Sequence, residues 1–209
     1  GLGAMILSSP GDIYYFGGFW GYGSGYRRQY ILVPSIGDPT MLTSRIEEAY
    51  ASASTWISDI RPYTEYQESG VSESEPESLA AIIRDKINPG SKVGYEEDDL
   101  TIGDFLTLQS FTTSYKLVPA KYVAYELRIV KEDREIELMK KAGLVAMAQA
   151  DAIRQEVKPG VAEYELTNVG RAAGSRKAEE LMVEGELRFS PLIPGIQIIS
   201  SGKQKADWV

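Results

Sequence analysis

The sequence predicts an α/β protein, in which residues 1 to about 125 form a mixed sheet flanked by helices and a long helix follows. Two observations support this prediction. Short apolar runs that end in turn residues alternate with helical periodicity through the first half of the chain, which is the pattern of an α/β domain. One apolar stripe at helical spacing then continues unbroken from residue 132 to residue 157.

The predicted strands are short apolar segments bounded by turn residues. Residues 4–7 form the first, and the Ser-Ser-Pro-Gly-Asp sequence after it predicts a turn. Residues 30–33 and 40–43 lie on either side of a Gly-Asp-Pro sequence, so we expect them to pair as a hairpin. Two further short strands are predicted at residues 57–60 and 92–95.

The predicted helices repeat apolar residues at intervals of three and four. Residues 47–53 are weakly helical, and residues 79–87 keep helical spacing until an Asn-Pro-Gly sequence stops them. The long helix at residues 132–157 ends at Lys-Pro-Gly, because proline cannot continue a helix and glycine tolerates the turn that follows. We expect a second helix at residues 163–182 and extended hairpin structure at residues 187–200.

The composition narrows the classes of function. The chain has 209 residues, of which 43% are hydrophobic and 25% charged, as in ordinary globular proteins. Its net charge of −8 argues against a nucleic-acid partner, since neutralising phosphates requires clustered Lys and Arg. The absence of histidine and cysteine excludes disulfides, Ser-His-Asp triads and imidazole or thiolate metal ligands within this sequence. No apolar run reaches the ~20 residues of a membrane span, so we expect no membrane partner.

Residues 96–99 place four carboxylates in a row, Glu-Glu-Asp-Asp. Carboxylate oxygens bind hard cations, but consecutive side chains point in different directions and seldom converge on one ion. We therefore interpret this run as a solvated loop or the start of a helix, where acidic residues suit the helix dipole. No metal ligand is assigned to it.

A glycine-rich loop carries Phe19, Trp20 and Tyr22 and is followed by Arg27 and Arg28. The glycines lack the GxGxxG spacing of a nucleotide site, and an extended segment rather than a helix follows them. The aromatic side chains suit an interface or the rim of a pocket, and an ordinary loop that caps the core is the alternative. An arginine beside aromatic surface can bind a carboxylate through two parallel hydrogen bonds. A surface arginine pair that binds nothing is the alternative here.

Four segments, in this order and spacing, resemble the creatinase/Xaa-Pro peptidase family, which includes prolidase and aminopeptidase P. Residues 13–19 are similar to a Tyr-x-x-Gly-Phe stretch of the family's N-terminal domain. Residues 128–142 resemble the R-x-x-K-x-x-x-E-I-x-x-x-x-x-A sequence that starts its catalytic domain. Residues 158–166 resemble its K-P-G-x-x-E-x-E-L junction between two helices, and residues 201–202 resemble a Ser-Gly that precedes a histidine.

The resemblance implies a creatinase-type N-terminal domain at residues 1–127, with its first element missing, and the beginning of a pita-bread α+β catalytic domain at residues 128–209. A change in composition near residues 127–131 marks the same boundary. The family's metal ligands lie beyond the Ser-Gly sequence, so we expect no catalytic residue and no metal ligand among these residues. For the full-length protein, the resemblance implies two divalent metal ions.

The resemblance further implies that the full-length protein is a metal-dependent hydrolase. We expect a cytoplasmic homodimer that cleaves a C–N bond in a short Xaa-Pro peptide or in a small creatine-like amidine. Two alternatives are a lyase that acts on another small zwitterion and a non-catalytic pita-bread module that binds or scaffolds. A histidine followed by spaced Asp, Asp, His, Glu and Glu beyond residue 209 would indicate the enzyme.

The resemblance also implies a substrate-binding arginine. In creatinase-type members, an arginine after the aromatic loop reaches the active site of the partner subunit and binds the substrate carboxylate. Aligning the strand at residues 30–33 with the family places Arg28 at this position, and Arg27 is its competitor. Trp20 and Tyr22 are expected to line the same substrate-binding surface.

Overall fold

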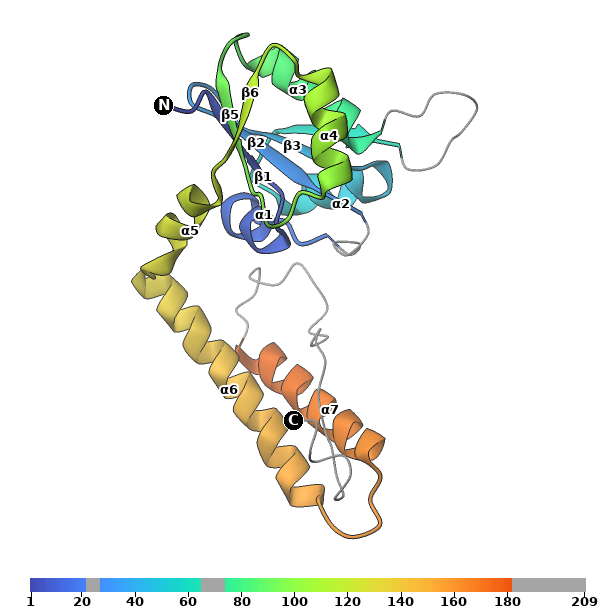
Figure 1. Cartoon of the computed structure of the whole chain (residues 1–209). Helices are drawn as coiled ribbons and strands as arrows, with labels where there is room; N and C mark the ends of the chain where they lie inside the picture. Colours follow the sequence, from blue (N-terminus) through green and yellow to red (C-terminus); the bar gives the residue numbers. More distant parts are fainter. Residues whose placement is uncertain (22–26, 65–73, 182–209) are drawn as a thin grey trace. The chain divides into compact units, whose positions relative to one another are not determined.

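The computed structural model describes residues 1–21, 27–64 and 74–181. The chain forms two units, Gly1–Val130 and a second that begins at Lys131 (Figure 1). Tyr22, the predicted hairpin at residues 187–200 and the Ser-Gly sequence at residues 201–202 lie outside the described residues.

The first unit is built on a mixed sheet, whose six strands among the described residues have the order β4-β3-β2-β1-β5-β6 (Figure 1). The strands are β1 (Ala4–Leu7), β2 (Tyr30–Pro34), β3 (Thr40–Ser44), β4 (Asp59–Tyr63), β5 (Lys92–Tyr95) and β6 (Lys116–Pro119). β2 is antiparallel to its neighbours β1 and β3, whereas β1, β5 and β6 are parallel to one another, as are β3 and β4. The predicted α/β fold with a mixed sheet is therefore confirmed.

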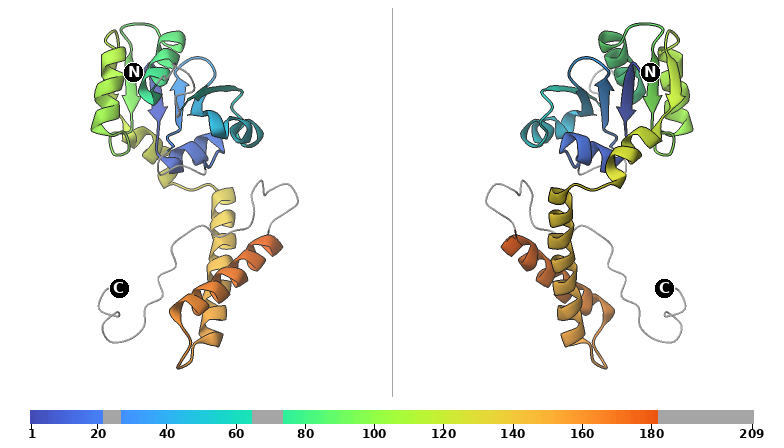
Figure 2. Two further views of the ribbon diagram at one scale, coloured as in Figure 1. Left: turned by 90° about the vertical axis from the view of Figure 1, so that its right-hand side faces the viewer. Right: turned by 90° about the vertical axis from the view of Figure 1, so that its left-hand side faces the viewer.

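Helices cover both faces of this sheet (Figure 2). They are α1 (Pro10–Gly17), α2 (Glu48–Ser54) after the 3₁₀ turn Arg45–Glu47, α3 (Glu75–Lys86), α4 (Ile102–Phe111) and α5 (Lys121–Ile129). One buried cluster joins Ile6 and Leu32 of the sheet to α3 and α4. A second cluster joins Met5 and Ile31 to α1, α2 and α5. Successive strand residues thus point into opposite cores, which is why β1 and the start of β2 are apolar throughout.

Helix α1 begins where the sequence pattern predicts a turn. Ser9 caps it, since the Ser9 hydroxyl accepts a hydrogen bond from the backbone N–H of Asp12 at 3.2 Å. Pro10 lies in the first turn, where a missing N–H is tolerated. Gly18 ends the helix in the left-handed conformation, with a φ of 72°. The turn prediction for residues 8–12 is wrong because a serine followed by proline is also a helix start.

The other elements of the first unit agree with the sequence in part. The strands predicted at residues 4–7, 30–33, 40–43 and 92–95 are confirmed as β1, β2, β3 and β5. The strand predicted at residues 57–60 is displaced toward the C-terminus and becomes β4. The sequence pattern predicts no element where α4, β6 and α5 lie.

The second unit contains α6 (Asp133–Glu156) and α7 (Glu163–Leu181), which pack against each other (Figure 1). α6 begins with a capping box, in which the backbone N–H of Glu132 donates to the Glu135 carboxylate at 2.8 Å. The chain turns between the helices at Gly160, which has a φ of 94°. The predictions of both helices are confirmed for the described residues.

Burial is sparse in this helical pair. Within residues 131–181, α6 has no buried residue, and α7 buries Leu166, Gly170 and Gly174. The predicted apolar stripe of α6 is therefore present in the sequence but largely uncovered by the described residues. No helix in the described ranges is long and apolar enough to cross a membrane.

Candidate functional site

Five strands end at the same edge of the sheet, because β2 alone of the described strands is antiparallel to the others. The strands whose carboxyl ends lie at this edge are β1, β3, β4, β5 and β6. From β1, the strands β2, β3 and β4 follow one another outward on one side of the sheet. The next strand, β5, pairs with the other side of β1, and β6 follows β5 on that side. In open α/β sheets, ligands bind beyond the carboxyl ends of the strands where the order reverses in this way. The topology therefore points to the crevice where β1 and β5 end.

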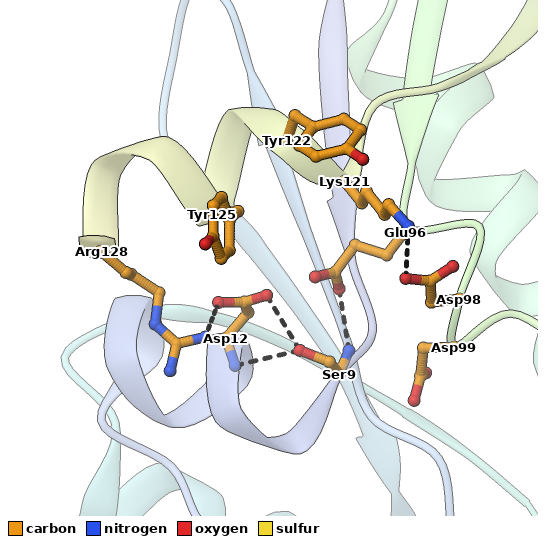
Figure 3. A pocket seen from close by; sticks show the side chains of 9 residues that line it. All are labelled: Ser9, Asp12, Glu96, Asp98, Asp99, Lys121, Tyr122, Tyr125 and Arg128. Atoms are coloured by element: carbon orange, nitrogen blue, oxygen red, sulfur yellow. Dashed lines mark hydrogen bonds and ion pairs between the residues drawn. The ribbon is translucent and has the colours of Figure 1, made fainter.

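A pocket of about 350 Å³ lies in this crevice (Figure 3). Ser9 and Asp12 line it from the turn after β1 and from the start of α1. Glu96 and Asp99 line it from the loop after β5, and α5 provides most of the remaining lining. None of these residues is a site residue in the sequence analysis.

Glu96 joins the ends of β1 and β5. Its carboxylate accepts hydrogen bonds from the backbone N–H groups of Ser8 and Ser9, and the bond from Ser9 measures 2.8 Å. Only 4% of Glu96 is exposed. Burial raises the pKa of Glu96 to about 7, and the neighbouring Asp12 adds to this shift while the two backbone N–H groups oppose it. Glu96 therefore holds a proton in weakly acidic solution and releases it near neutral pH.

Asp12 is the second buried carboxyl group of the pocket, with 7% of the residue exposed. The Ser9 hydroxyl donates to Asp12 Oδ2 at 2.9 Å, and the guanidinium of Arg128 on α5 pairs with Asp12 Oδ1 (Figure 3). Burial acts to raise the pKa of Asp12, but the hydrogen bonds with Glu96, Ser9 and Arg128 outweigh burial and lower it. The pKa values of the two carboxyl groups are therefore shifted in opposite directions, up for Glu96 and down for Asp12.

The carboxylates of residues 96–99 diverge, as the sequence predicts. Glu97 accepts hydrogen bonds from the backbone N–H groups of Ala120 and Lys121, each at 3.1 Å. Asp98 pairs with Lys121 Nζ at 2.6 Å. The interpretation of this run as solvated is wrong for Glu96, because the Glu96 side chain is buried between the ends of β1 and β5.

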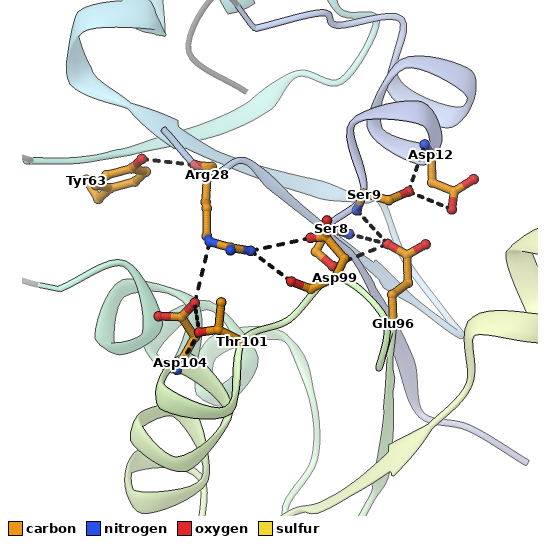
Figure 4. A network of polar contacts seen from close by, with 9 residues as sticks. All are labelled: Ser8, Ser9, Asp12, Arg28, Tyr63, Glu96, Asp99, Thr101 and Asp104. Carbon is orange, nitrogen blue, oxygen red and sulfur yellow. Dashed lines mark hydrogen bonds and ion pairs between the residues drawn. The ribbon is translucent and has the colours of Figure 1, made fainter. Parts of the chain in front are cut away.

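Arg28 reaches the same edge of the sheet from the residues before β2. Its Nη1 donates to the backbone oxygen of Asp99 at 3.0 Å, and its Nε lies 3.5 Å from Oδ2 of Asp104 in the first turn of α4 (Figure 4). The Tyr63 hydroxyl, at the end of β4, donates to the backbone oxygen of Arg28 at 3.0 Å. Since the Arg28 side chain is 30% exposed, these contacts orient the guanidinium without burying it.

Phe19 and Trp20, the described aromatic residues between Gly17 and Gly21, differ in burial. Phe19 is fully buried and packs against Tyr50, with ring centroids 5.4 Å apart. Trp20 is 44% exposed and stands edge-on to Tyr14 of α1 at 6.1 Å between centroids. The loop therefore caps the core through Phe19 and presents Trp20 at the surface. Arg27 is partly exposed.

The described residues do not fit a metal centre. The sequence has no histidine or cysteine. In residues 1–21, 27–64 and 74–181, no group of three or more Asp or Glu side chains is placed to hold a metal ion. A metal-dependent reaction would therefore need ligands from other residues.

Comparisons with known proteins agree with this fold. Residues 1–130 match the family described as Creatinase/Prolidase N-terminal domain. Creatinase from a Bacillus species is 22% identical over 192 residues, which cover 90% of this chain and 44% of the relative. An uncharacterized hydrolase/peptidase from Sinorhizobium fredii is 24% identical, over 79% of this chain and 43% of the relative.

Two solved structures share the fold. X-Pro aminopeptidase from Thermotoga maritima has a TM-score of 0.66 at 18% identity, covering 85% of this chain and 47% of its own. Recombinant prolidase from Thermococcus sibiricus has a TM-score of 0.67 at 23% identity, covering 83% of this chain and 45% of its own. The chain thus spans less than half the length of each of these four relatives.

Proposed function

Because the chain belongs to the Creatinase/Prolidase N-terminal domain family, we propose that it is the N-terminal part of a metal-dependent hydrolase that cleaves a C–N bond. The observation that carries the proposal is the family match over residues 1–130, which are also the residues of the first unit. In this proposal α6 and α7 are the first helices of the catalytic domain. The relatives include a creatinase, a prolidase and an X-Pro aminopeptidase, and such enzymes are hydrolases.

The proposed substrate is a short peptide with an Xaa-Pro bond. The similar solved structures are of an X-Pro aminopeptidase and a prolidase, which favours the peptide. The match to creatinase extends over 90% of the chain, which keeps a small creatine-like amidine as the second choice. Since the described residues do not fit a metal centre, the two divalent ions of the proposed enzyme would be held by other residues.

Arg28 is the proposed substrate-binding residue, acting across a homodimer on the substrate carboxylate. Its contacts with Asp99 and Asp104 use Nη1 and Nε, so Nη2 has no partner among the described residues. A guanidinium held in this way keeps donors for a carboxylate while its orientation is already set. Arg27 is the competing candidate, and Trp20 and Tyr22 are proposed to line the same surface; these assignments rest on the family resemblance.

The complete protein, loaded with Mn²⁺, is expected to release free proline from Ala-Pro and to leave Ala-Ala uncleaved. The physical reason is that a site shaped for the rigid proline ring discriminates against a smaller side chain. Product analysis by mass spectrometry, with creatine as a third substrate, checks this expectation. Cleavage of creatine alone would move the proposal to the amidine. No product from any of the three would contradict the hydrolase and favour a binding module.

A further inference from the structure

We propose that Asp12 and Glu96 share one proton and form a pH-sensitive clasp between α1 and the loop that follows β5. The clasp consists of these two carboxyl groups and of Ser9 and Arg128, which hold Asp12 (Figure 3). It lies in the crevice where β1 and β5 end, at the pocket described above. The proposal is independent of the hydrolase activity.

Both members of the clasp are fixed in place by partners of their own. Glu96 is held by the backbone N–H groups of Ser8 and Ser9. Asp12 is held by the Ser9 hydroxyl and by Arg128, which also lies over the ring of Tyr15 at 5.3 Å. With 4% and 7% exposure, neither carboxyl group can turn into solvent without losing these hydrogen bonds. Both carboxyl groups are hydrogen-bonded to Ser9, at 2.8 Å for Glu96 and 2.9 Å for Asp12, and two buried carboxyl groups that line one pocket resist ionising together.

Among the described residues, the surrounding charges leave one cation to offset the pair. The other charged or titratable groups around it are Tyr15 of α1, Glu97, Asp98 and Asp99 after β5, and Lys121, Tyr122 and Tyr125 of α5. Lys121 is paired with Asp98, and Arg28 with Asp99. Arg128 is therefore the cation in contact with the clasp, and one guanidinium offsets only one carboxylate.

The sign of the pH dependence follows from the two pKa shifts. The pKa of Glu96 is raised from 4.5 to about 7 by burial and by Asp12, so the folded chain keeps a proton that the unfolded chain loses. This contribution to stability is complete below pH 4.5 and is lost as the pH rises through 7. The lowered pKa of Asp12 preserves its ion pair with Arg128 until the solution becomes strongly acidic. The clasp is therefore closed in weakly acidic solution and weakens above neutrality.

The clasp also supports Arg28. The backbone N–H groups of Asp99 and Leu100 donate to the backbone oxygen of Glu96 at 3.3 and 3.1 Å. Glu96 thus begins the turn that carries Asp99, and Asp99 holds the guanidinium of Arg28 (Figure 4). Weakening the clasp above neutral pH loosens this support.

Glu96→Gln tests the clasp, because the amide reproduces the protonated carboxyl group at every pH. Its oxygen can accept from Ser8 and Ser9, and its NH₂ can donate to Asp12. Hydrogen exchange of the β1 amides in the 209-residue chain, corrected for the intrinsic rates, reports the opening equilibrium of the first unit. We compare the opening equilibrium constant of the wild type with that of Glu96→Gln at each pH. The ratio of the two constants is expected to increase by about tenfold to a hundredfold between pH 5 and pH 8.

Two further variants act as controls. Asp12→Asn should weaken the wild-type pH dependence, because Asp12 no longer adds to the raised pKa of Glu96 and the amide can donate to ionised Glu96, while Glu96 stays buried. Glu97→Gln changes the neighbouring carboxylate but leaves both members of the clasp, so it should keep the wild-type profile. In ¹³C NMR, the Glu96 carboxyl of the wild type should titrate near pH 7 and shift to lower pH in Asp12→Asn. Parallel profiles for wild type and Glu96→Gln, or titration of Glu96 below pH 5, would overturn the proposal.

Discussion

Phe19→Ala is expected to lower the free energy of unfolding of the first unit by about 3–5 kcal/mol, the usual cost of truncating a buried phenylalanine. Phe19 is fully buried in the cluster that joins the sheet to α1, α2 and α5, and its ring packs against Tyr50. Removing the ring would leave a cavity under the loop that leads to Arg28. Chemical denaturation measures this loss of free energy. Amide hydrogen exchange in β1 and β2 measures it a second time.

Trp20→Ala is the matched control in the same loop. Trp20 is 44% exposed and its ring contact is with Tyr14, so truncation should cost only about 0.5–1.5 kcal/mol. If Trp20 lines the substrate-binding surface, its loss should appear instead as a higher KM of the complete protein. Equal destabilisation by the two substitutions would contradict the assignment of Phe19 to the core and of Trp20 to the surface.

Arg28→Ala is expected to lower kcat/KM of the complete protein by about 10–200-fold, mainly through KM. A charge-assisted hydrogen-bonded contact with a substrate carboxylate contributes roughly 1.5–3 kcal/mol. Because Arg28 would bind the substrate without transferring a proton, substrate and transition state should lose this contact together. Steady-state kinetics on the complete protein measure the split between KM and kcat.

Three variants separate substrate binding by Arg28 from a purely structural role. Arg28→Lys should recover only part of the loss, because an ammonium cannot reproduce the planar guanidinium. Asp104→Asn weakens one contact that orients Arg28 but keeps the guanidinium, so it should raise KM less than Arg28→Ala does. A normal KM in Arg28→Ala together with a raised KM in Arg27→Ala would assign the role to the neighbouring arginine. No change in KM for either would leave the loop a structural element.

The sheet and the helical pair could be predicted from the sequence because their signals are local. β1 and the first three residues of β2 are buried on both faces, so each is a short apolar run. α6 combines a long apolar stripe with a capping box and a Lys-Pro-Gly stop. The family resemblance came from the same local sequences.

The pocket could not be predicted because contacts between distant residues create it. The Glu96 carboxylate accepts hydrogen bonds from the N–H groups of Ser8 and Ser9, which lie 88 and 87 positions earlier in the chain. α5 has no side-chain cap from its own sequence, and Glu97 provides one from more than 20 positions away. One signal was available, since acidic and hydroxyl residues directly follow two predicted strands, residues 4–7 and 92–95. Only the parallel pairing of these strands shows that they meet.

Release of proline from Ala-Pro by the complete protein, measured before and after removal of divalent ions by a chelator, tests the proposed metal-dependent hydrolase most directly. The described residues provide no metal site of their own, so the assay reports on the whole protein. Proline release is expected to stop after chelation and to return when Mn²⁺ is added back. Undiminished release from the chelated protein would contradict the proposed function.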